Sequence, residues 1–169
     1  MDLTLRIAGI EEDSIVDGPG LRMTVFTQGC LRNCKGCHNP QTHALDKGTL
    51  VPVADLLAQF KDNPLLSGIT FSGGEPFLQP EPLLWLARQV HSLGKTVMAF
   101  SGYTLEELLE RGLKKTHVSD LINELDYLVD GPYVEELRNL ELEYRGSSNQ
   151  RYLQKDEIAG MIRLWKEKH

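Results

Sequence analysis

Short apolar runs alternate with amphipathic stretches along the chain, and this alternation predicts repeated βα units. Residues 21–28 (LRMTVFTQ) combine β-branched and aromatic side chains, a composition that favours a strand. Residues 51–62 place apolar side chains at i, i+3, i+4 and i+7, which predicts a helix with one buried stripe. The pattern then repeats, with further strands predicted over 67–72, 95–100 and 126–130.

Capping and breaking residues set the ends of the later helices. Pro82 in a first helical turn opens one helix, which stops at Gly94. Thr104 begins the Thr-x-x-Glu spacing of a capping box at the start of the next helix. Residues 145–151 (RGSSNQR) predict a polar turn between two extended pieces, and a last helix is predicted over 156–168.

The number of these units limits the fold class. Four or five βα units are too few to close an eight-stranded barrel, so we expect an α/β fold with an open or partial parallel sheet. A length of 169 residues, with 41% hydrophobic and 25% charged residues, is ordinary for one globular domain. We therefore expect a single domain over residues 1–169.

Charge and hydropathy exclude some classes of partner. The formal net charge of −6 argues against nucleic acid, because phosphate binding requires a basic face. No stretch approaches the roughly 18 uninterrupted apolar residues of a membrane span, so no membrane partner is expected. Residues 1–20 carry several acidic side chains and lack the apolar core of a secretory signal. A cytoplasmic location is the resulting prediction.

All three cysteines, Cys30, Cys34 and Cys37, lie within eight residues of each other. An odd number at this density is a poor disulfide framework and indicates a metal centre. Three thiolates on a tight loop can hold three corners of a four-iron, four-sulfur cube, and the fourth iron is then open to a small molecule. A structural zinc site is the alternative, with His38 or His43 as the fourth ligand.

The turn Ser72-Gly73-Gly74-Glu75 is a second candidate site, because it follows a predicted strand and precedes a helix. Ligands of α/β sheets bind at the carboxyl ends of strands. Two glycines allow a ligand to approach the backbone closely, and the Glu75 carboxylate can accept from an ammonium group. The alternative is an ordinary strand-to-helix turn that binds nothing.

Four further positions are candidates for ligand contacts. Asp130 ends a predicted strand, where its carboxylate can accept from a ligand hydroxyl or contact a cation; a capping or turn role is the alternative. Ser101 follows another strand and either lines a ligand pocket or belongs to a plain loop. The turn 17–20 either shapes the approach to the cysteine loop or is simply a Gly-Pro-Gly turn. Arg145 and residues 147–150 form a polar turn that can contact a ligand or a partner.

These motifs together carry a family resemblance. A Cys-x3-Cys-x2-Cys loop after one strand and a Gly-Gly-Glu turn after the next resemble the radical S-adenosylmethionine enzymes. Residues 14–40 resemble the start of glycyl-radical-enzyme activases. Residues 126–138 and 144–151 are similar to the activating proteins of anaerobic (class III) ribonucleotide reductase. The three runs keep the order of the family and span most of the chain.

The resemblance implies a partial (open) parallel βα barrel with a cluster loop at residues 29–39. It implies a [4Fe-4S] cluster held by the three cysteines and S-adenosylmethionine chelated by the open iron. Gly73, Gly74 and Glu75 would hold the methionine amino end. Ser101 would line the adenosine pocket, and the Asp130 carboxylate would accept from ribose hydroxyls or contact bound cations. An electron from the cluster would cleave S-adenosylmethionine to a 5′-deoxyadenosyl radical, so that no side chain has to act as a base.

The implied partner is a glycyl-radical enzyme, namely the large subunit of anaerobic ribonucleotide reductase, from which a backbone glycine hydrogen is removed. A low-potential donor such as flavodoxin would supply the electron. Two other functions remain open at this point: activation of a different glycyl-radical enzyme or modification of a peptide, and a non-catalytic zinc-binding module.

Overall fold

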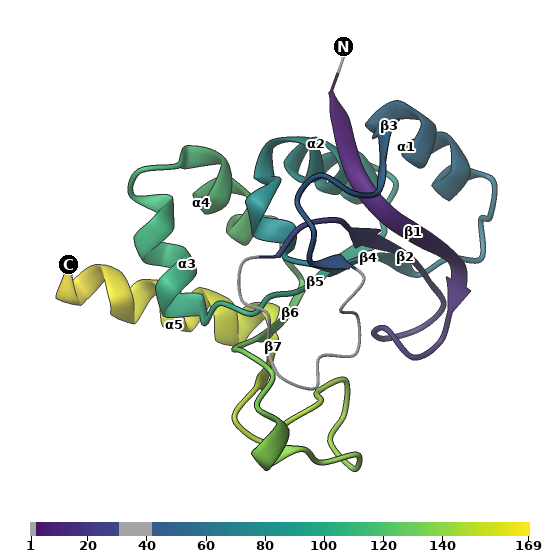
Figure 1. Cartoon of the computed structure of the whole chain (residues 1–169). Coiled ribbons are helices and arrows are strands. Elements are labelled where there is room, and N and C mark those ends of the chain that lie inside the picture. Colours follow the sequence, from purple (N-terminus) through teal and green to yellow (C-terminus); the bar gives the residue numbers. More distant parts are fainter. Residues whose placement is uncertain (1–2, 31–41) are drawn as a thin grey trace.

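The computed structural model describes residues 3–30 and 42–169 (Figure 1). Cys30 lies within these residues, whereas Cys34, Cys37 and His38 lie outside them, as does most of the predicted cluster loop. The described residues therefore test how the base of that loop is built.

In the described part of the chain, seven strands form one sheet in the order β3-β1-β2-β4-β5-β6-β7. The four central strands β2, β4, β5 and β6 run parallel to one another. At one edge β1 pairs antiparallel with β2 and β3 pairs antiparallel with β1, and at the other edge β7 pairs antiparallel with β6. The strands are β1 (Thr4–Ser14), β2 (Arg22–Thr27), β3 (Thr49–Pro52), β4 (Gly68–Gly73), β5 (Thr96–Phe100), β6 (Tyr127–Asp130) and β7 (Arg151–Gln154).

The helices form a continuous layer in which α1 contacts α2, α2 contacts α4, α4 contacts α3 and α3 contacts α5 (Figure 1). Two short 3₁₀ turns, η2 and η3, follow β4 and β6. The helical elements are α1 (Val53–Lys61), η2 (Pro76–Leu78), α2 (Pro80–Ser92), α3 (Leu105–Gly112), α4 (Thr116–Asn123), η3 (Glu135–Leu137) and α5 (Lys155–Lys168).

The two faces of the parallel sheet differ in chemistry, because successive side chains of a strand point to opposite faces. One face carries apolar residues such as Val25 and Phe71, which belong to the core shared with the helices. The alternate positions of β2 and β4 carry buried polar residues such as Arg22, Thr24 and Thr70. The hydrophobic core therefore lies on the helical side, and the polar face is left for a site.

Arg22 anchors this polar face although no part of it is exposed. Its guanidinium donates to the hydroxyl oxygens of Thr70 and Thr96, both at 2.8 Å, and to the Pro19 carbonyl at 3.0 Å. Burial lowers the pKa of Arg22. The Thr70 hydroxyl in turn donates to the Asp17 carbonyl at 2.8 Å. This chain of bonds ties the turn between β1 and β2 to the middle of the sheet.

Most predicted elements are confirmed by the structure. The strands predicted over 21–28, 67–72, 95–100 and 126–130 are β2, β4, β5 and β6, each within one or two residues of its expected ends. The capping box at Thr104 is present, because its side chain accepts from the Glu107 N–H and the Glu107 carboxylate accepts from the Thr104 N–H. The α/β class with parallel strands is therefore confirmed.

Other expectations need correction. Residues 51–52 belong to β3 rather than to the following helix, because they pair with β1. The sequence pattern did not predict β1 or α4, and of the two extended pieces expected around residues 145–151 only β7 is a strand. The described strands form an open sheet with antiparallel edges, so the structure does not confirm a barrel.

Candidate functional site

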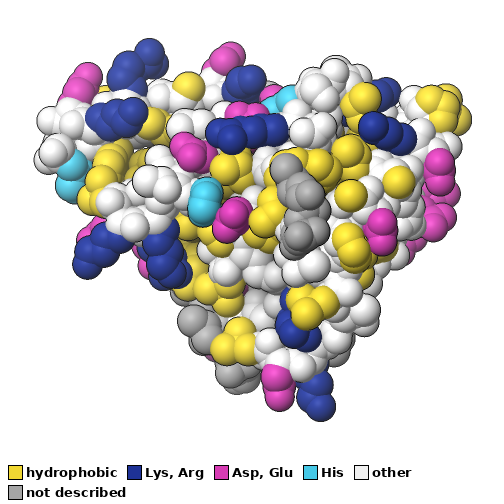
Figure 2. Space-filling view, turned by 90° about the horizontal axis from the view of Figure 1, so that it is seen from above, with side chains coloured by type: hydrophobic (Ala, Val, Ile, Leu, Met, Phe, Trp, Pro, Cys, Tyr) yellow, Lys and Arg dark blue, Asp and Glu magenta, His cyan; other side chains and the backbone are white. Residues whose placement is uncertain are grey.

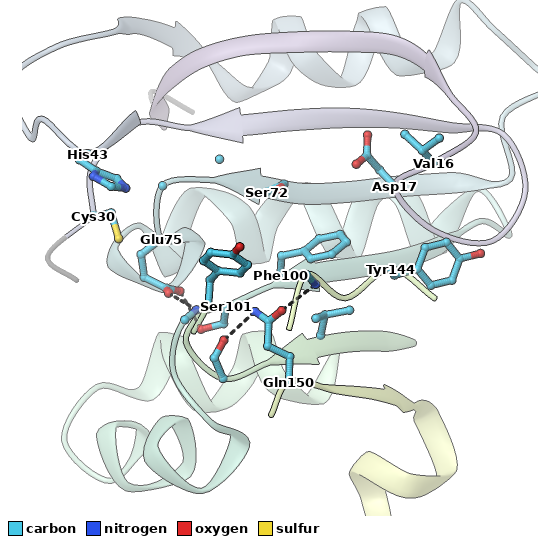
Figure 3. A pocket seen from close by; sticks show the side chains of 17 residues that line it. Val16, Asp17, Cys30, His43, Ser72, Glu75, Phe100, Ser101, Tyr144 and Gln150 are labelled. Atoms are coloured by element: carbon cyan, nitrogen blue, oxygen red, sulfur yellow. Dashed lines mark hydrogen bonds between the residues drawn. The ribbon is translucent and has the colours of Figure 1, made fainter. Parts of the chain in front are cut away.

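A cavity of about 270 Å³ opens on the polar side of the sheet, at the carboxyl ends of the parallel strands. The predicted residues Cys30, Ser72, Gly73, Gly74, Glu75 and Ser101 all line it (Figure 3). This is the position at which α/β sheets bind ligands. The other lining residues are Val16, Asp17, His43, Phe100, Gly102, Val129, Gly131, Tyr133, Tyr144, Gly146 and Gln150.

Backbone hydrogen bonds close the base of the cysteine loop. The Gly29 N–H donates to the Thr42 carbonyl at 2.6 Å, and the Cys30 N–H donates to the His43 carbonyl at 3.0 Å. The two ends of segment 31–41 are thereby held side by side, with Cys30 half-buried at the cavity wall. Figure 3 shows its sulfur and the His43 ring at the same end of the cavity as Glu75.

The Gly-Gly-Glu turn is joined directly to this loop base. The Gly74 N–H donates to the Thr27 carbonyl at 2.8 Å, and the Glu75 N–H donates to the Gly29 carbonyl at 2.7 Å. A Cβ atom on Gly74 would lie 2.3 Å from the Gly29 carbonyl oxygen, which is closer than real contacts allow. Both glycines line the cavity, but the crowding at Gly74 comes from the protein backbone rather than from space kept for a ligand.

Gly73 has a separate reason to be glycine. Its φ of +93° lies in the region that L side chains rarely adopt. A Cβ there would also meet the backbone nitrogen and oxygen of Thr27 at 2.5 Å. The turn after β4 therefore packs on β2 so closely that neither position has room for a side chain.

Glu75 and Ser101 meet at the wall of the cavity, as their common assignment to one site requires. Glu75 is 2% exposed, and its Oε2 accepts from the Ser101 hydroxyl at 2.9 Å and from the Phe77 N–H at 3.1 Å. Its Oε1 accepts from the Gly102 N–H at 2.7 Å. These bonds fix the orientation of the carboxylate at the cavity wall.

Asp130 is placed differently from the sequence-based expectation. It is 1% exposed and is not among the residues that line the cavity. Its Oδ2 accepts from the Leu105 N–H at 2.7 Å, which caps the start of α3, and its Oδ1 accepts from Arg151 Nε at 2.9 Å. The carboxylate thus has the capping role given as the alternative, and a contact with a ligand stays a prediction.

The arginine that binds Asp130 also reaches Glu106 on α3, at 2.6 Å. Hydrogen bonds to the two carboxylates raise the pKa of Arg151, so it stays charged at any ordinary pH. The hydrogen bond from Arg151 is the main reason why the pKa of Glu106 is lowered. Asp130, Arg151 and Glu106 thus form a group of three charges that joins β6 and β7 to α3.

The far end of the cavity contains side chains that the sequence pattern did not assign to a ligand. Val16, Asp17 and Tyr144 lie there, away from Cys30 (Figure 3). The Asp17 carboxylate accepts from the hydroxyls of Ser14 at 2.6 Å and Thr24 at 3.1 Å. These bonds hold Asp17 at the cavity, and the role of the turn 17–20 in the approach to the cysteine loop stays a prediction.

Tyr144 is the one non-glycine residue with a positive φ, +60°, in the part of the chain that the structure describes. Its ring packs edge-on against Tyr152 of β7 at a centroid distance of 5.0 Å. Burial raises the pKa of Tyr152 to about 12, so both rings pack as neutral phenols. The unusual backbone angle and the ring contact together hold Tyr144 at the cavity.

Gln150, within the predicted polar turn, also lines the cavity. Its side-chain oxygen accepts from the Gly146 N–H at 2.9 Å, and its amide donates to the Gly131 carbonyl at 3.0 Å. The sequence signal for this contact was the polar run itself. Phe100, Val129 and Tyr133 gave no such signal, because apolar residues at strand ends are as common in cores as in sites.

Of the three cysteines predicted to hold a metal centre, the described residues include Cys30. Within residues 3–30 and 42–169 no group of three His, Cys, Asp or Glu side chains is placed to hold a metal ion. The predicted ligands Cys34 and Cys37 lie outside these ranges. Cys30 is at the cavity wall beside the Gly-Gly-Glu turn, which fits a cluster that must be reached by a ligand from that cavity.

None of the helices among the described residues combines the length and the apolar character needed to cross a membrane. This finding agrees with the hydropathy of the sequence.

Comparison with known proteins identifies the family. Residues 16–153 match the family described as "4Fe-4S single cluster domain". The anaerobic ribonucleoside-triphosphate reductase-activating protein of Salmonella typhimurium is 39% identical over 145 residues, which cover 80% of this chain and 90% of the relative. The protein of the same name from Escherichia coli K12 is 37% identical over the same lengths.

Two more distant similarities were found. The pyruvate formate-lyase-activating enzyme of Clostridium pasteurianum is 39% identical over 114 residues, which cover 62% of this chain and 48% of that enzyme. The crystal structure of QueE from Escherichia coli is 18% identical, with a TM-score of 0.46, over 60% of this chain and 53% of that one.

The cluster-domain match favours iron–sulfur over the zinc alternative. The extent and identity of the activating-protein matches confirm the resemblance carried by the cysteine loop and the two later motifs. This chain belongs to the family of anaerobic ribonucleoside-triphosphate reductase-activating proteins.

Proposed function

We propose that this protein is a radical S-adenosylmethionine enzyme that generates a glycyl radical on an anaerobic ribonucleoside-triphosphate reductase. One observation carries the proposal: Cys30 and the Gly-Gly-Glu turn share one cavity wall and are joined through the Glu75 N–H to Gly29 carbonyl bond of 2.7 Å. The base of the cysteine loop, at Gly29 and Cys30, and the Gly-Gly-Glu turn are therefore joined directly. Family membership supplies the reaction class.

Cys30, Cys34 and Cys37 would hold the cluster. When bound, a [4Fe-4S] cluster with three thiolate ligands supplies the electron that cleaves S-adenosylmethionine reductively. The closed base of the loop fixes the direction of Cys30, because its N–H is bonded to the His43 carbonyl. A fixed first ligand reduces the entropy lost when the remaining loop wraps a cluster.

Glu75 would orient the methionine end of S-adenosylmethionine. Its carboxylate is buried and is held by Ser101 and Gly102, so it can bind an ammonium group without first reorganising. The Gly73 and Gly74 backbone and Ser72 form the adjoining wall. Ser101 acts through Glu75 and also lines the cavity, which is consistent with its assignment to the adenosine pocket.

The far end of the cavity, at Asp17 and Tyr144, is where a glycine of the partner would approach. A protein loop can reach it only if the cavity stays open on that side. An open sheet with antiparallel edges provides this access, whereas a fully closed barrel would not. We propose that the whole chain, residues 1–169, forms one domain of partial-barrel type with its cluster loop at 29–39.

We also propose a cytoplasmic location and reduction of the cluster by a low-potential donor such as flavodoxin. Anaerobic reconstitution tests the chemistry directly: about four iron atoms per chain and reductant-dependent cleavage of S-adenosylmethionine are expected. Co-incubation with the reductase large subunit should then give a protein-centred glycyl radical signal in electron paramagnetic resonance. One zinc per chain with no cleavage would instead establish a binding module.

A cysteine variant and a second substrate extend this experiment. Cys34→Ala should lose both cluster and cleavage while the α/β core stays folded, as judged by circular dichroism. Retained turnover in this variant would remove Cys34 from the ligand set.

Pyruvate formate-lyase is the second candidate substrate, because an activating enzyme for it is 39% identical over part of this chain. A radical on that lyase but not on the reductase would change the partner assignment.

A further inference from the structure

The connection between β6 and β7, residues 131–150, forms one projecting element that we name the β6–β7 lip. It extends below the sheet in Figure 1 and contains the short turn η3. The segments 126–138 and 144–151 that resemble reductase-activating proteins overlap its two ends and continue into β6 and β7. Two motifs that are separated in sequence are therefore two sides of one structure.

Cross-links between its two sides make the lip rigid. The Ser148 N–H donates to the Leu137 carbonyl at 2.8 Å, and the Asn139 N–H donates to the Gly146 carbonyl at 3.1 Å. Ser147 is fully buried between the two sides. A pre-organised element of this kind loses little conformational entropy when it binds a partner.

The root of the lip reaches the cavity, but its outer part does not. Gln150 and Tyr144 line the cavity, whereas Leu137 and Leu140 are 43% and 75% exposed and do not. Exposed leucines on a rigid projection have no role in the core of this chain. They are the kind of side chain that anchors a protein–protein interface.

A second apolar pair lies on the opposite side of the cavity mouth. Ile15 and Val16, in the turn between β1 and β2, are 76% and 72% exposed. Val16 lines the same cavity as Tyr144, and Figure 3 shows the two residues at the same end. Val16 thus places an exposed apolar side chain at the same end of the cavity as Tyr144 of the lip.

The lip and the end of β1 carry an excess of acidic side chains. The lip has four exposed glutamates against two arginines, Arg138 and Arg145, and three exposed acids precede Ser14 at the end of β1. On the face seen in Figure 2, by contrast, side chains of both signs are spread over the surface. The acidic residues concerned are Glu135, Glu136, Glu141 and Glu143 on the lip and Glu11, Glu12 and Asp13 on β1.

We propose that the β6–β7 lip and the turn at Ile15 and Val16 form the docking surface for the reductase. The occupant is a segment of the glycyl-radical enzyme that presents apolar side chains flanked by Lys or Arg, so that its glycine reaches the far end of the cavity. The inference rests on the proposed function, and three features carry it: exposed leucines, acidic borders and continuity with the cavity.

The apolar part is tested by Leu137→Ser combined with Leu140→Ser in the reconstituted holoenzyme. Neither residue lines the cavity, so cleavage of S-adenosylmethionine without partner should be unchanged. The Kd for the purified reductase large subunit should rise at least roughly tenfold, as for loss of interface anchors. Leu65→Ser is the matched control, because Leu65 is 77% exposed just before the amino end of β4.

The charged part is tested by Glu136→Lys combined with Glu141→Lys. Association with the reductase should slow and should lose most of its dependence on salt, because long-range attraction is removed. The control, Glu110→Lys with Glu167→Lys, makes the same change in net charge on α3 and α5. Glycyl radical yield should recover at high reductase concentration in both lip variants, because docking and not chemistry is weakened.

Each outcome decides a separate question. If the wild-type protein cleaves S-adenosylmethionine and binds the reductase, equal binding by the leucine variant overturns the lip as a docking surface. Wild-type cleavage without reductase binding overturns the choice of occupant. Absence of cleavage by the wild type refutes the proposed chemistry, and the Kd comparison still decides whether the lip binds the reductase.

Discussion

The turns that follow β4 and β6 lie at the same edge of the sheet, and each places a buried carboxylate beside a glycine. In sequence they look equivalent, Gly-Gly-Glu in one and Asp-Gly-Pro in the other. In the structure Glu75 lines the cavity and Asp130 does not. The carboxyl end of a strand is therefore a favourable position for a ligand site, but the neighbours of each side chain decide its use.

The glycines of the two turns differ in the same way. A Cβ on Gly74 would meet the Gly29 carbonyl oxygen at 2.3 Å, whereas a Cβ on Gly131 would find its nearest neighbour at 3.7 Å. Gly131 is glycine because of its φ of +99°, not because of crowding. The β4 turn packs against the base of the cysteine loop, whereas the β6 turn is held by hydrogen bonds from the Gly131 N–H to the Tyr103 carbonyl and from the Gln150 amide to the Gly131 carbonyl.

The largest expected effect is that of Gly74→Ala. The added methyl must push the β4 turn away from Gly29, which should cost about 3 kcal/mol of unfolding free energy and disturb the loop that carries Cys30. Iron content after anaerobic reconstitution should fall severalfold, measured per chain against the wild type. Gly131→Ala is the matched variant and should lose only about 1 kcal/mol, with full iron content.

Equal iron content in the two alanine variants would contradict this reading of the turns. It would mean that the β4 turn can move without affecting the cysteine loop, and that the bond from the Glu75 N–H to Gly29 is incidental to cluster binding.

Glu75→Gln should have the next largest effect, and it should act on affinity. The amide keeps the shape of the side chain and an acceptor for Gly102, but it removes the negative charge. Loss of a charge-assisted hydrogen bond to an ammonium group should weaken S-adenosylmethionine binding roughly 10- to 100-fold. Equilibrium binding to the reconstituted protein measures this change, and unchanged affinity would remove Glu75 from the binding site.

Asp130→Asn is the same chemical change in the other turn, with the opposite expectation. Asparagine can still cap α3 at Leu105, but Arg151 loses its buried anionic partner. Unfolding free energy should fall by about 2 kcal/mol in urea titrations. Affinity for S-adenosylmethionine should stay within about twofold of the wild type. A large loss of affinity with normal stability would restore Asp130 as a ligand contact.

Local patterns in the sequence were sufficient for the central fold. β2, β4, β5 and β6 follow from β-branched and apolar runs, and the capping box at Thr104 follows from two residues three apart. The strand β1 was missed because a bulge between Ile7 and Gly9 interrupts its alternation and its end is acidic. Its place is set by pairing with β2 and β3, which is information from distant residues.

The same distinction applies to the site. Cys30 and Glu75 were found because their motifs are short and continuous in sequence. Gln150 was named as part of a polar run, whereas Tyr144 gave no local signal and is brought to the cavity by the connection between the paired strands β6 and β7. The capping role of Asp130 and its pairing with Arg151 become visible only when the register of β6 and β7 is known.

The smallest effect should come from Glu106→Gln, which tests the ion pair between Glu106 of α3 and Arg151 of β7. Arg151 lowers the pKa of Glu106, so the pair stabilises the fold above the ordinary glutamate pKa of 4.5 and ceases to do so as pH falls through the lowered value. The side chains of Arg151 and Glu106 are 38% and 52% exposed, which limits the loss near pH 7 to less than about 1 kcal/mol. The difference between variant and wild type in urea should therefore shrink as the pH falls below 4.5 and vanish once Glu106 is protonated in the folded protein. A difference that persists in acid would show that Glu106 acts through packing on α3 rather than through its charge.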